Sequence, residues 1–323
     1  MKKIFYIFIS AIVLTAFYSC QDDWTEEQYE KYVSFVRHGY TETYLNSNVP
    51  DGVIHYKIPI VISGSTINDR NVTITVELDP DTLRQYNIDQ FYTTRSDLWY
   101  RQLDEEYYNF PNGKTVTIPA GKDIGYLDVD FMLNDLDLVE KYILPLKIVS
   151  TSEYTPTPKW YKKTLMRIIP FNYFSGTYSA NAATITAEGD NTPAAMATRE
   201  MRVVNDSAVF FYAGLCEENA RNRALYKVRT KFNADNTISF TADSAQIQFT
   251  PVPGKCTWTI EEKMDALQPY LMIRTLTMDL QYSYMDLTNP DYPVKYNLTG
   301  FYTMERRKNT QIPDDQQQEI FEW

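Results

Sequence analysis

Seven short runs of alternating apolar and polar residues predict β-strands in the first half of the chain. They end at turn residues such as Pro50-Asp51-Gly52 and are rich in Val, Ile and Thr, as strands usually are. The runs cover residues 32–36, 54–62, 71–78, 115–118, 125–131, 142–149 and 163–169. Residues 79–87 have Pro near their start and Asn at their end, which predicts one or two helical turns. Strands at this spacing fit one Ig-like β-sandwich over residues 32–170.

The second half of the chain continues the alternation. Its runs cover residues 184–186, 199–204, 208–212, 225–232, 237–241, 246–250, 257–260, 271–284 and 296–306. Gly176-Thr177-Tyr178 opens this half and residues 297–304 close it, like the first and last strands that pair in a closed barrel. The expected fold class is all-β, with a lipocalin-like antiparallel β-barrel over residues 171–307. A second β-sandwich is the alternative, and residues 308–323 are expected to form a polar tail.

The first twenty residues have the order of a secretory leader. Met1-Lys2-Lys3 precedes an apolar run over residues 4–17, which is shorter than the roughly 20 residues that cross a bilayer. The following Cys20 resembles the lipidated residue of a lipoprotein signal, although Phe17 departs from that pattern. Asp22 and Asp23 resemble the Bacteroidetes signal that directs lipoproteins to the outer face of the outer membrane. An ordinary leader with a chance Cys is the alternative. Residues 21–31 are expected to be a tether.

Composition narrows the possible partners. The net charge of −11 argues against nucleic acid, and against a membrane contact other than the lipid anchor, because such partners need clustered Lys and Arg. Beyond Cys20 only Cys216 and Cys256 are present, too few for a disulfide framework. We expect free thiols there, with a pair as the alternative. The 26 Tyr exceed what is usual, and Tyr serves both strands and binding surfaces.

Motifs for catalysis are missing from the sequence. His38 and His55 are the two histidines, and neither lies in a metal-binding spacing. The sequence contains no Gly-x-Ser-x-Gly elbow, no P-loop and no Gly-x-Gly-x-x-Gly. We therefore expect a protein that is not an enzyme and needs no cofactor or metal. A glycoside hydrolase with an unrecognised carboxylate pair is an alternative, because sequence does not show which carboxylates meet.

Two irregular segments combine aromatic residues with hydrogen-bonding side chains. A sugar site needs flat rings that stack on the CH faces of a pyranose, framed by polar groups that bind its hydroxyls. The segments span residues 91–109 and 282–296. The candidate glycan-binding residues are Trp99, Tyr100, Tyr107, Tyr108, Tyr284 and Tyr292. Packing inside the fold is the alternative for each of them.

The region from Asn71 to Pro170 resembles a known domain. The residues that carry the resemblance are Val72-Thr-Ile-Thr-Val76, Leu83-Arg-Gln-Tyr86-Asn87, Val116-Thr-Ile-Pro119-Ala-Gly121 and Tyr142-Ile-Leu-Pro145-Leu-Lys-Ile148. They are similar to the Ig-like N-terminal domain of Bacteroidetes surface lipoproteins, of the adhesin-like and glycosidase-associated family. The resemblance implies a SusE-like accessory glycan binder beside a SusC/SusD-type outer-membrane importer. Beyond residue 171 it is weaker.

The same N-terminal domain also precedes hydrolases of the chitinase-like barrel type. About 150 residues follow it here, whereas a TIM barrel needs roughly 250. The Asp-x-x-Asp-x-Asp-x-Glu motif of that class is absent, and Asp123, Asp128 and Asp130 come closest to it. We therefore expect a non-catalytic lipoprotein at the outer membrane, exposed on the cell surface, that binds a polysaccharide or oligosaccharide. The first alternative is a structural or adhesin-like protein that binds another protein.

Overall fold

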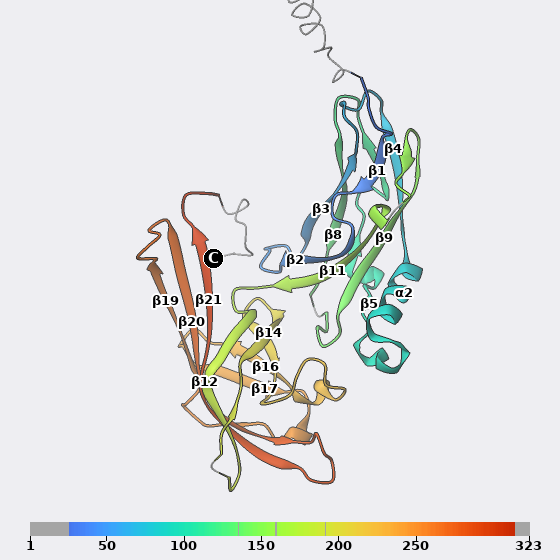
Figure 1. Ribbon diagram of the computed structural model, residues 1–323. Helices are drawn as coiled ribbons and strands as arrows, with labels where there is room; N and C mark the ends of the chain where they lie inside the picture. The colour runs from blue at the N-terminus through green and yellow to red at the C-terminus, as the bar shows by residue number, and fades with distance from the viewer. Residues whose placement is uncertain (1–25, 135, 159, 191, 314–323) are drawn as a thin grey trace, which may run out of the picture.

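The computed structural model describes residues 26–134, 136–158, 160–190 and 192–313. Cys20 and the leader lie outside this part of the chain. The described residues form two β-rich units, one with two stacked sheets and one with a single curled sheet, and β11 leads from the first to the second (Figure 1). The prediction of an all-β fold in two domains is confirmed.

The first unit is a sandwich of two sheets. One sheet has the order β10-β1-β3-β8-β6, and the other has the order β2-β11-β9-β4-β7 with β5 added to β9. The strands are β1 (Tyr32–Phe35), β2 (Gly39–Asn46), β3 (Ile54–Ile62), β4 (Val72–Leu78), β5 (Arg101–Gln102), β6 (Tyr108–Asn109), β7 (Thr115–Ile118), β8 (Ile124–Phe131), β9 (Tyr142–Thr151), β10 (Thr155–Pro156) and β11 (Lys163–Phe171).

Alternation along the strands builds the sandwich core. In β4, Val72, Ile74 and Val76 are fully buried, and the residues between them are exposed or half-buried. Ile60 of β3 and Val129 of β8 enter the same core from the facing sheet. Each buried side chain of this size stabilises the fold by about 1.5–3 kcal/mol, so the period of two defines which face of each sheet is inside.

Strand β2 was not among the predicted strands. Its sequence, GYTETYLN, lacks the β-branched alternation of its neighbours. It nevertheless pairs in parallel with β11 over eight residues, from Gly39 opposite Thr164 to Asn46 opposite Phe171. The hydrogen bonds of β2 come from this parallel partner, and the local sequence of β2 does not predict them. The strand places Glu42 and Tyr44 on the outer face of the sandwich.

Helix α2 (Pro80–Phe91) is longer than the one or two turns predicted. Asp79 caps it, accepting hydrogen bonds from the backbone N–H of Thr82 at 3.4 Å and from its hydroxyl at 2.6 Å. Leu83 packs on Ile143 and Leu165 of the second sheet, so the helix covers part of the outer face of the sandwich. The 3-10 helices are η1 (Thr93–Leu98), η2 (Glu105–Tyr107), η3 (Trp160–Lys162), η4 (Arg223–Tyr226) and η5 (Ala245–Ile247).

The second unit is one antiparallel sheet with the order β17-β16-β15-β14-β12-β21-β20-β18, with β13 on β12 and β19 on β20. Its first and last long strands, β12 and β21, pair as predicted. The strands are β12 (Gly176–Ala187), β13 (Ala194–Ala195), β14 (Thr198–Asn205), β15 (Ala208–Tyr212), β16 (Lys227–Phe232), β17 (Ile238–Ala242), β18 (Thr250–Pro251), β19 (Thr257–Met264), β20 (Leu271–Asp286) and β21 (Val294–Asn309).

The sheet curls until its two sides meet near the start of β17. A single bridge joins Thr237 to Thr257, and Ile238 donates its backbone N–H to the carbonyl of Cys256 at 3.0 Å. Aromatic rings fill the space inside, including the fully buried Phe211 and Tyr302. These rings pack the interior of the curled sheet, as side chains do in small barrels.

The predicted strand over residues 246–250 was wrong. The chain forms η5 there, with Ser244 accepting from the backbone N–H of Gln246. Gln248 then adopts a left-handed conformation with φ of 46°, which no strand tolerates. Cys216 and Cys256 are free thiols, Cys256 buried and Cys216 half-buried. No helix in the described ranges is long and apolar enough to cross a bilayer.

Candidate functional site

Polar contacts join the two units beside η1. The buried Arg223, on the loop that follows β15, is central to them. Its Nε donates to the carbonyl of Val139 at 3.2 Å and its Nη2 to the carbonyl of Asp97 at 3.1 Å. Arg95 of η1 donates in return to the carbonyl of Asn219 at 2.7 Å. Because charged groups bind backbone carbonyls from both directions, the two units hold each other in a defined orientation.

Ion pairs extend this junction. Lys227 of β16 lies 2.8 Å from Asp137 in the first unit. Lys141, next to β9, lies 3.6 Å from Glu218 in the second unit. Burial lowers the pKa of Lys141, and Glu218 partly offsets this. The second pair marks the edge of a cleft between the units.

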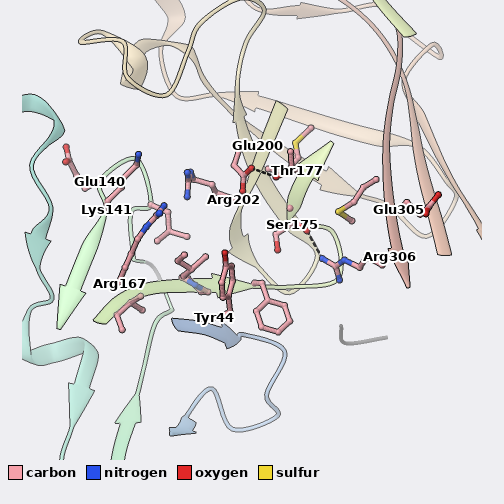
Figure 2. A pocket seen from close by; sticks show the side chains of 18 residues that line it. Tyr44, Glu140, Lys141, Arg167, Ser175, Thr177, Glu200, Arg202, Glu305 and Arg306 are labelled. Carbon is pink, nitrogen blue, oxygen red and sulfur yellow. Dashed lines mark hydrogen bonds between the residues drawn. The ribbon is translucent and has the colours of Figure 1, made fainter. Parts of the chain in front are cut away.

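The interdomain cleft consists of two adjoining hollows of about 310 and 650 Å³. Figure 2 shows Lys141 and Arg167 of the first unit and Arg202 of the second reaching into the same space. The volumes fall within the range of ordinary ligand sites. The polar and aromatic residues that define the cleft are Glu42, Tyr44, Lys141, Arg167, Thr177, Glu200, Arg202 and Glu218.

Strand pairing explains how the first unit presents its share of the cleft. In the parallel pair of β2 and β11, Glu42 lies opposite Arg167 and Tyr44 opposite Ile169. Tyr44 keeps 42% of its surface exposed, and its hydroxyl donates to Glu42 at 2.8 Å. Burial raises the pKa of Tyr44, and Glu42 raises it further. The ring is therefore an un-ionised aromatic face at the entrance of the cleft.

Two Arg–Glu pairs line the cleft. Arg167 contacts Glu42 at 2.5 Å, and Arg202 contacts Glu218 at 2.6 Å, with its Nε at 2.9 Å. Burial acts to raise the pKa of Glu218, but the charge of Arg202 and its hydrogen bonds outweigh this, so the pKa lies below its ordinary value. The pKa of Glu42 is lowered as well, where Tyr44 and Arg167 outweigh the effect of burial. Both carboxylates are ionised at neutral pH.

An apolar floor lies beneath these charges. It is formed where β11 passes into β12, against one strand on each side. Its residues are Ile169, Pro170, Phe171, Met201 and Met304. The cleft therefore combines apolar surface, one exposed ring and paired charges, which is the combination that binds molecules with both CH faces and hydroxyl groups.

Two core tyrosines position the loop that carries Glu218. The hydroxyl of Tyr282 accepts from the backbone N–H of Gly214 at 3.2 Å, and that of Tyr284 accepts from Leu215 at 3.1 Å. Gly214 has a φ of 58°, and a Cβ there would lie 2.0 Å from the Tyr284 ring. Only glycine fits this position, and the loop then turns toward the first unit.

The predicted residues of the first aromatic segment take different places. Trp99 is half-buried and lines a further hollow of about 260 Å³ beside Lys141 and Glu218. Its indole Nε1 donates to the carbonyl of Tyr92 at 2.9 Å. Tyr100 is half-buried, and its ring packs on Tyr40, Tyr86 and Phe91. Of the four candidate residues in this segment, Trp99 is the one that lines this hollow.

The other predicted tyrosines lie elsewhere. Tyr107 is half-buried and Tyr108 is 6% exposed, and both pack on the sandwich core. Tyr284 is 1% exposed inside the curled sheet. The structure therefore places Tyr108 and Tyr284 in the interior of their units. Tyr292 is 75% exposed between β20 and β21. The structure does not bring the six predicted residues together.

Sequence reasoning missed the residues that define the cleft. Glu42 and Arg167 are 125 positions apart, and Arg202 and Glu218 belong to another unit. One local signal was present: Glu42 and Tyr44 alternate in GYTETYLN as the outward residues of a strand do. The pairing of β2 with β11 and the junction of the two units, which create the site, have no signature in either segment.

Known proteins place the chain in a family. Residues 24–152 match the model of a domain of unknown function, DUF4973, and residues 162–303 match a model described as "-like, C-terminal". A solved structure of unknown function from Bacteroides ovatus is 36% identical, with a TM-score of 0.82 over 90% of this chain and 100% of that one. The chain belongs to this family of two-domain Bacteroides proteins. No curated protein is significantly similar to it.

Two further solved structures are similar over most of the chain. A Bacteroides ovatus structure called a multidomain protein including DUF1735 is 35% identical, with a TM-score of 0.80 over 90% of this chain and 100% of that one. A structure called an auxiliary nutrient binding protein, from Bacteroides thetaiotaomicron, is 28% identical, with a TM-score of 0.76 over 86% of this chain and 94% of that one. One protein with a similar architecture is therefore named for nutrient binding.

Proposed function

We propose that this protein binds a nutrient glycan in the interdomain cleft and does not change it chemically. The observation that carries the proposal is the exposed ring of Tyr44 beside an apolar floor and two Arg–Glu pairs. The relative named an auxiliary nutrient binding protein supports the same class of function. The cleft brings an aromatic ring, apolar surface and polar groups together, as a sugar site requires. The predicted aromatic segments do not bring these features together in one place.

Each part of the cleft has a role toward a pyranose ring. The Tyr44 face stacks on the CH groups of one sugar face. The guanidinium groups of Arg167 and Arg202 donate to ring hydroxyls, and Glu200 accepts from them. The apolar floor contacts the CH groups of a second sugar unit. Planar rings and rigid guanidinium groups lose little conformational freedom on binding, which favours affinity.

The paired carboxylates Glu42 and Glu218 fit binding better than hydrolysis. A glycosidase needs one carboxylic acid that stays protonated near neutral pH, so its pKa must be raised. The pKa values of Glu42 and Glu218 are both lowered, as described above. We therefore propose a non-catalytic protein, which predicts that no reducing sugar is released from any polysaccharide that it binds.

The test of binding uses the chain without residues 1–20 and native gels that contain plant, yeast or host polysaccharides. Retardation by at least one glycan is expected. Tyr44→Ala should weaken it about tenfold, since the loss of a stacked ring costs roughly 1–2 kcal/mol. Tyr126→Ala, which removes a ring 52% exposed on β8, is the matched control. Tyr292→Ala tests the exposed loop that the sequence favoured.

The outcomes separate three possibilities. Loss in Tyr44→Ala alone supports the cleft. Loss in Tyr292→Ala with normal retardation of Tyr44→Ala moves the site to the loop between β20 and β21. Unretarded migration in every gel would reject glycan binding in favour of a structural or adhesin-like role with a protein partner.

We further propose that lipid at Cys20 holds the protein on the outer face of the outer membrane beside a SusC/SusD-type importer. The support is the leader sequence and the acidic pair after Cys20, together with the Bacteroides relatives. The chain should incorporate labelled palmitate and be digested by protease added to whole cells. Unlabelled protein, or protein protected in whole cells, would contradict the anchor or the address respectively.

A further inference from the structure

We infer that the interdomain cleft selects neutral sugar chains and rejects acidic ones. The inference rests on the proposed function, because it names the ligand class of the same site. It comes from the way in which each cationic side chain of the cleft is already engaged by an acceptor of this chain.

Each of the two guanidinium groups at the centre is paired with a carboxylate and keeps further N–H donors for the hydroxyls of a ligand. Arg202 donates from Nε and Nη2 to Glu218 at 2.6–2.9 Å. Arg167 donates to Glu42 at 2.5 Å and to the hydroxyl of Tyr40 at 3.2 Å. Both guanidinium groups are largely buried, with 13% and 15% of their side chains exposed. Charge-assisted pairs in such surroundings are strong.

The remaining cations are engaged in the same way. Arg306 donates to the backbone carbonyls of Asn172 at 3.0 Å and Ser175 at 2.6 Å, and Arg199 donates to the carbonyl of Gly214. Lys141 pairs with Glu218. A carboxylate or sulfate of an acidic sugar that paired with one of these cations in the same way would displace its acceptor, and a displaced Glu218 would remain in the cleft as a like charge.

The net charge of the cleft also disfavours an acidic ligand. The cleft is lined by five cations against six carboxylates, which leaves a net charge of −1. The cations are Lys141, Arg167, Arg199, Arg202 and Arg306, and the carboxylates are Glu42, Glu140, Glu200, Glu217, Glu218 and Glu305. The whole chain, including these residues, carries a charge of −11. An acidic polysaccharide therefore meets repulsion on approach as well as inside the cleft.

A neutral sugar avoids both the displacement of an acceptor and the electrostatic repulsion. Each hydroxyl is a donor and an acceptor at once, so it can donate to a carboxylate oxygen such as that of Glu200 while it accepts from a neighbouring N–H. Glu200 at present accepts from the hydroxyl of Thr177 at 2.7 Å and has further lone pairs for a ligand. No ion pair of the cleft has to open, and binding involves no net charge on the ligand.

The test compares each retained neutral polysaccharide with its own carboxymethylated derivative, which changes charge but not the backbone. Affinities are measured by titration calorimetry at low and at high NaCl. We expect the derivative to bind at least about tenfold more weakly at low salt. We expect the neutral chain to change less than about twofold with salt, because screening acts on charged partners. Glu200→Gln should narrow the gap between the two ligands, with Glu106→Gln, an exposed residue of η2, as control.

The failure of this inference is distinct from the failure of the proposed function. If the derivative binds as tightly as the neutral chain or more tightly, and Tyr44→Ala weakens both, the cleft is the site but its charge does not select. If Glu200→Gln and Glu106→Gln change the ratio equally, the selection does not come from the cleft. If no neutral chain binds at all, the proposed function falls, and this inference with it.

Discussion

At the scale of residues, buried tyrosines of the second unit both fill its core and hold a loop by hydrogen bonds. Their rings fill the inside of the curled sheet, where Tyr282 and Tyr284 pack with centroids 6.4 Å apart. Their hydroxyls reach its rim and accept from Gly214 and Leu215. A phenylalanine core would pack as well but would leave these backbone N–H groups without acceptors, which costs about 1–3 kcal/mol for each buried group. The abundance of Tyr in the sequence therefore has a structural use here.

Gly214→Ala tests this arrangement. The change places a Cβ 2.0 Å from the Tyr284 ring in a backbone with φ of 58°. We expect the free energy of unfolding to fall by about 2–4 kcal/mol, the sum of left-handed strain and overpacking. Gly254→Ala is the matched control, since its φ is 71° but nothing lies within 4 Å of the new Cβ, and it should lose about 1 kcal/mol. Equal losses in urea denaturation would show that the Tyr284 contact does not matter.

The same residues show where sequence reasoning ends. The sequence indicated correctly that residues 271–284 form a strand, and β20 covers them. The alternation up to Tyr284 indicates which face of that strand points inward, because the polar residues of the run take the half-buried positions, but it does not show what covers that face. Burial of Tyr284 depends on Tyr226 and Tyr296, which come from other strands and loops.

At the scale of elements, Asp79 holds the start of helix α2 on the outer face of the sandwich. The buried Asp79 accepts from Thr82 and also lies 3.1 Å from Lys163 of β11. One carboxylate thus links the start of the helix to the strand that later lines the cleft. Burial acts to raise the pKa of Asp79, but the hydrogen bonds from Thr82 and Lys163 outweigh it and hold the pKa below 3.8.

Asp79→Ala removes both the cap and the ion pair. We expect a loss of about 1–2 kcal/mol in unfolding free energy at neutral pH. Because the folded pKa is below the unfolded value of 3.8, the stabilisation is complete above that pH and is lost as the pH falls through the folded pKa. The difference between wild type and variant should therefore shrink in acid. Asp81→Ala, on the exposed first turn, should lose less, and a difference that grows in acid would contradict the assignment.

The strands that the sequence predicted well are those with a regular alternation of apolar and polar residues. The regular β3 and β4 were found within a residue of their ends, whereas β2, with its Thr-Glu-Thr centre, was missed. The run over residues 246–250 had strand-like composition but turns at Gln248. Elements whose hydrogen bonds come from distant partners carry little local signal, and in this protein such an element supplies Glu42 and Tyr44 of the candidate site.

At the scale of the whole molecule, polar contacts across the junction link the two walls of the cleft. Interfaces between domains are often mobile unless their contacts are extensive. Here Arg223, Arg95 and Lys227 bind acceptors across the junction, and the Lys141–Glu218 pair adjoins the cleft. A rigid cleft needs no ordering when a ligand binds, which preserves affinity. The length of the chain and its two sets of strands predicted the two units, but their docking depends on loops without strand signals.

Arg223→Ala tests whether this junction makes the molecule one cooperative unit. The change removes hydrogen bonds to Val139 and Asp97 and leaves two carbonyls without their donor, which should cost roughly 2–4 kcal/mol of coupling. We expect the single calorimetric transition of the wild type to broaden or split, because each unit has its own core and then unfolds at its own temperature. Glycan affinity should fall as well, since the walls of the cleft belong to different units.

Arg229→Ala provides the matched control. That arginine pairs with Asp243 inside the second unit and is 52% exposed, so its loss should leave one sharp transition and unchanged affinity. A sharp, downshifted transition in Arg223→Ala would mean that the arginine stabilises its own unit only. The cleft would then keep its shape through the covalent passage of β11 into β12 and the packing around it, and the junction would have no part in binding. A split transition with intact affinity would lead to the same conclusion, because the walls could then move without loss of the ligand.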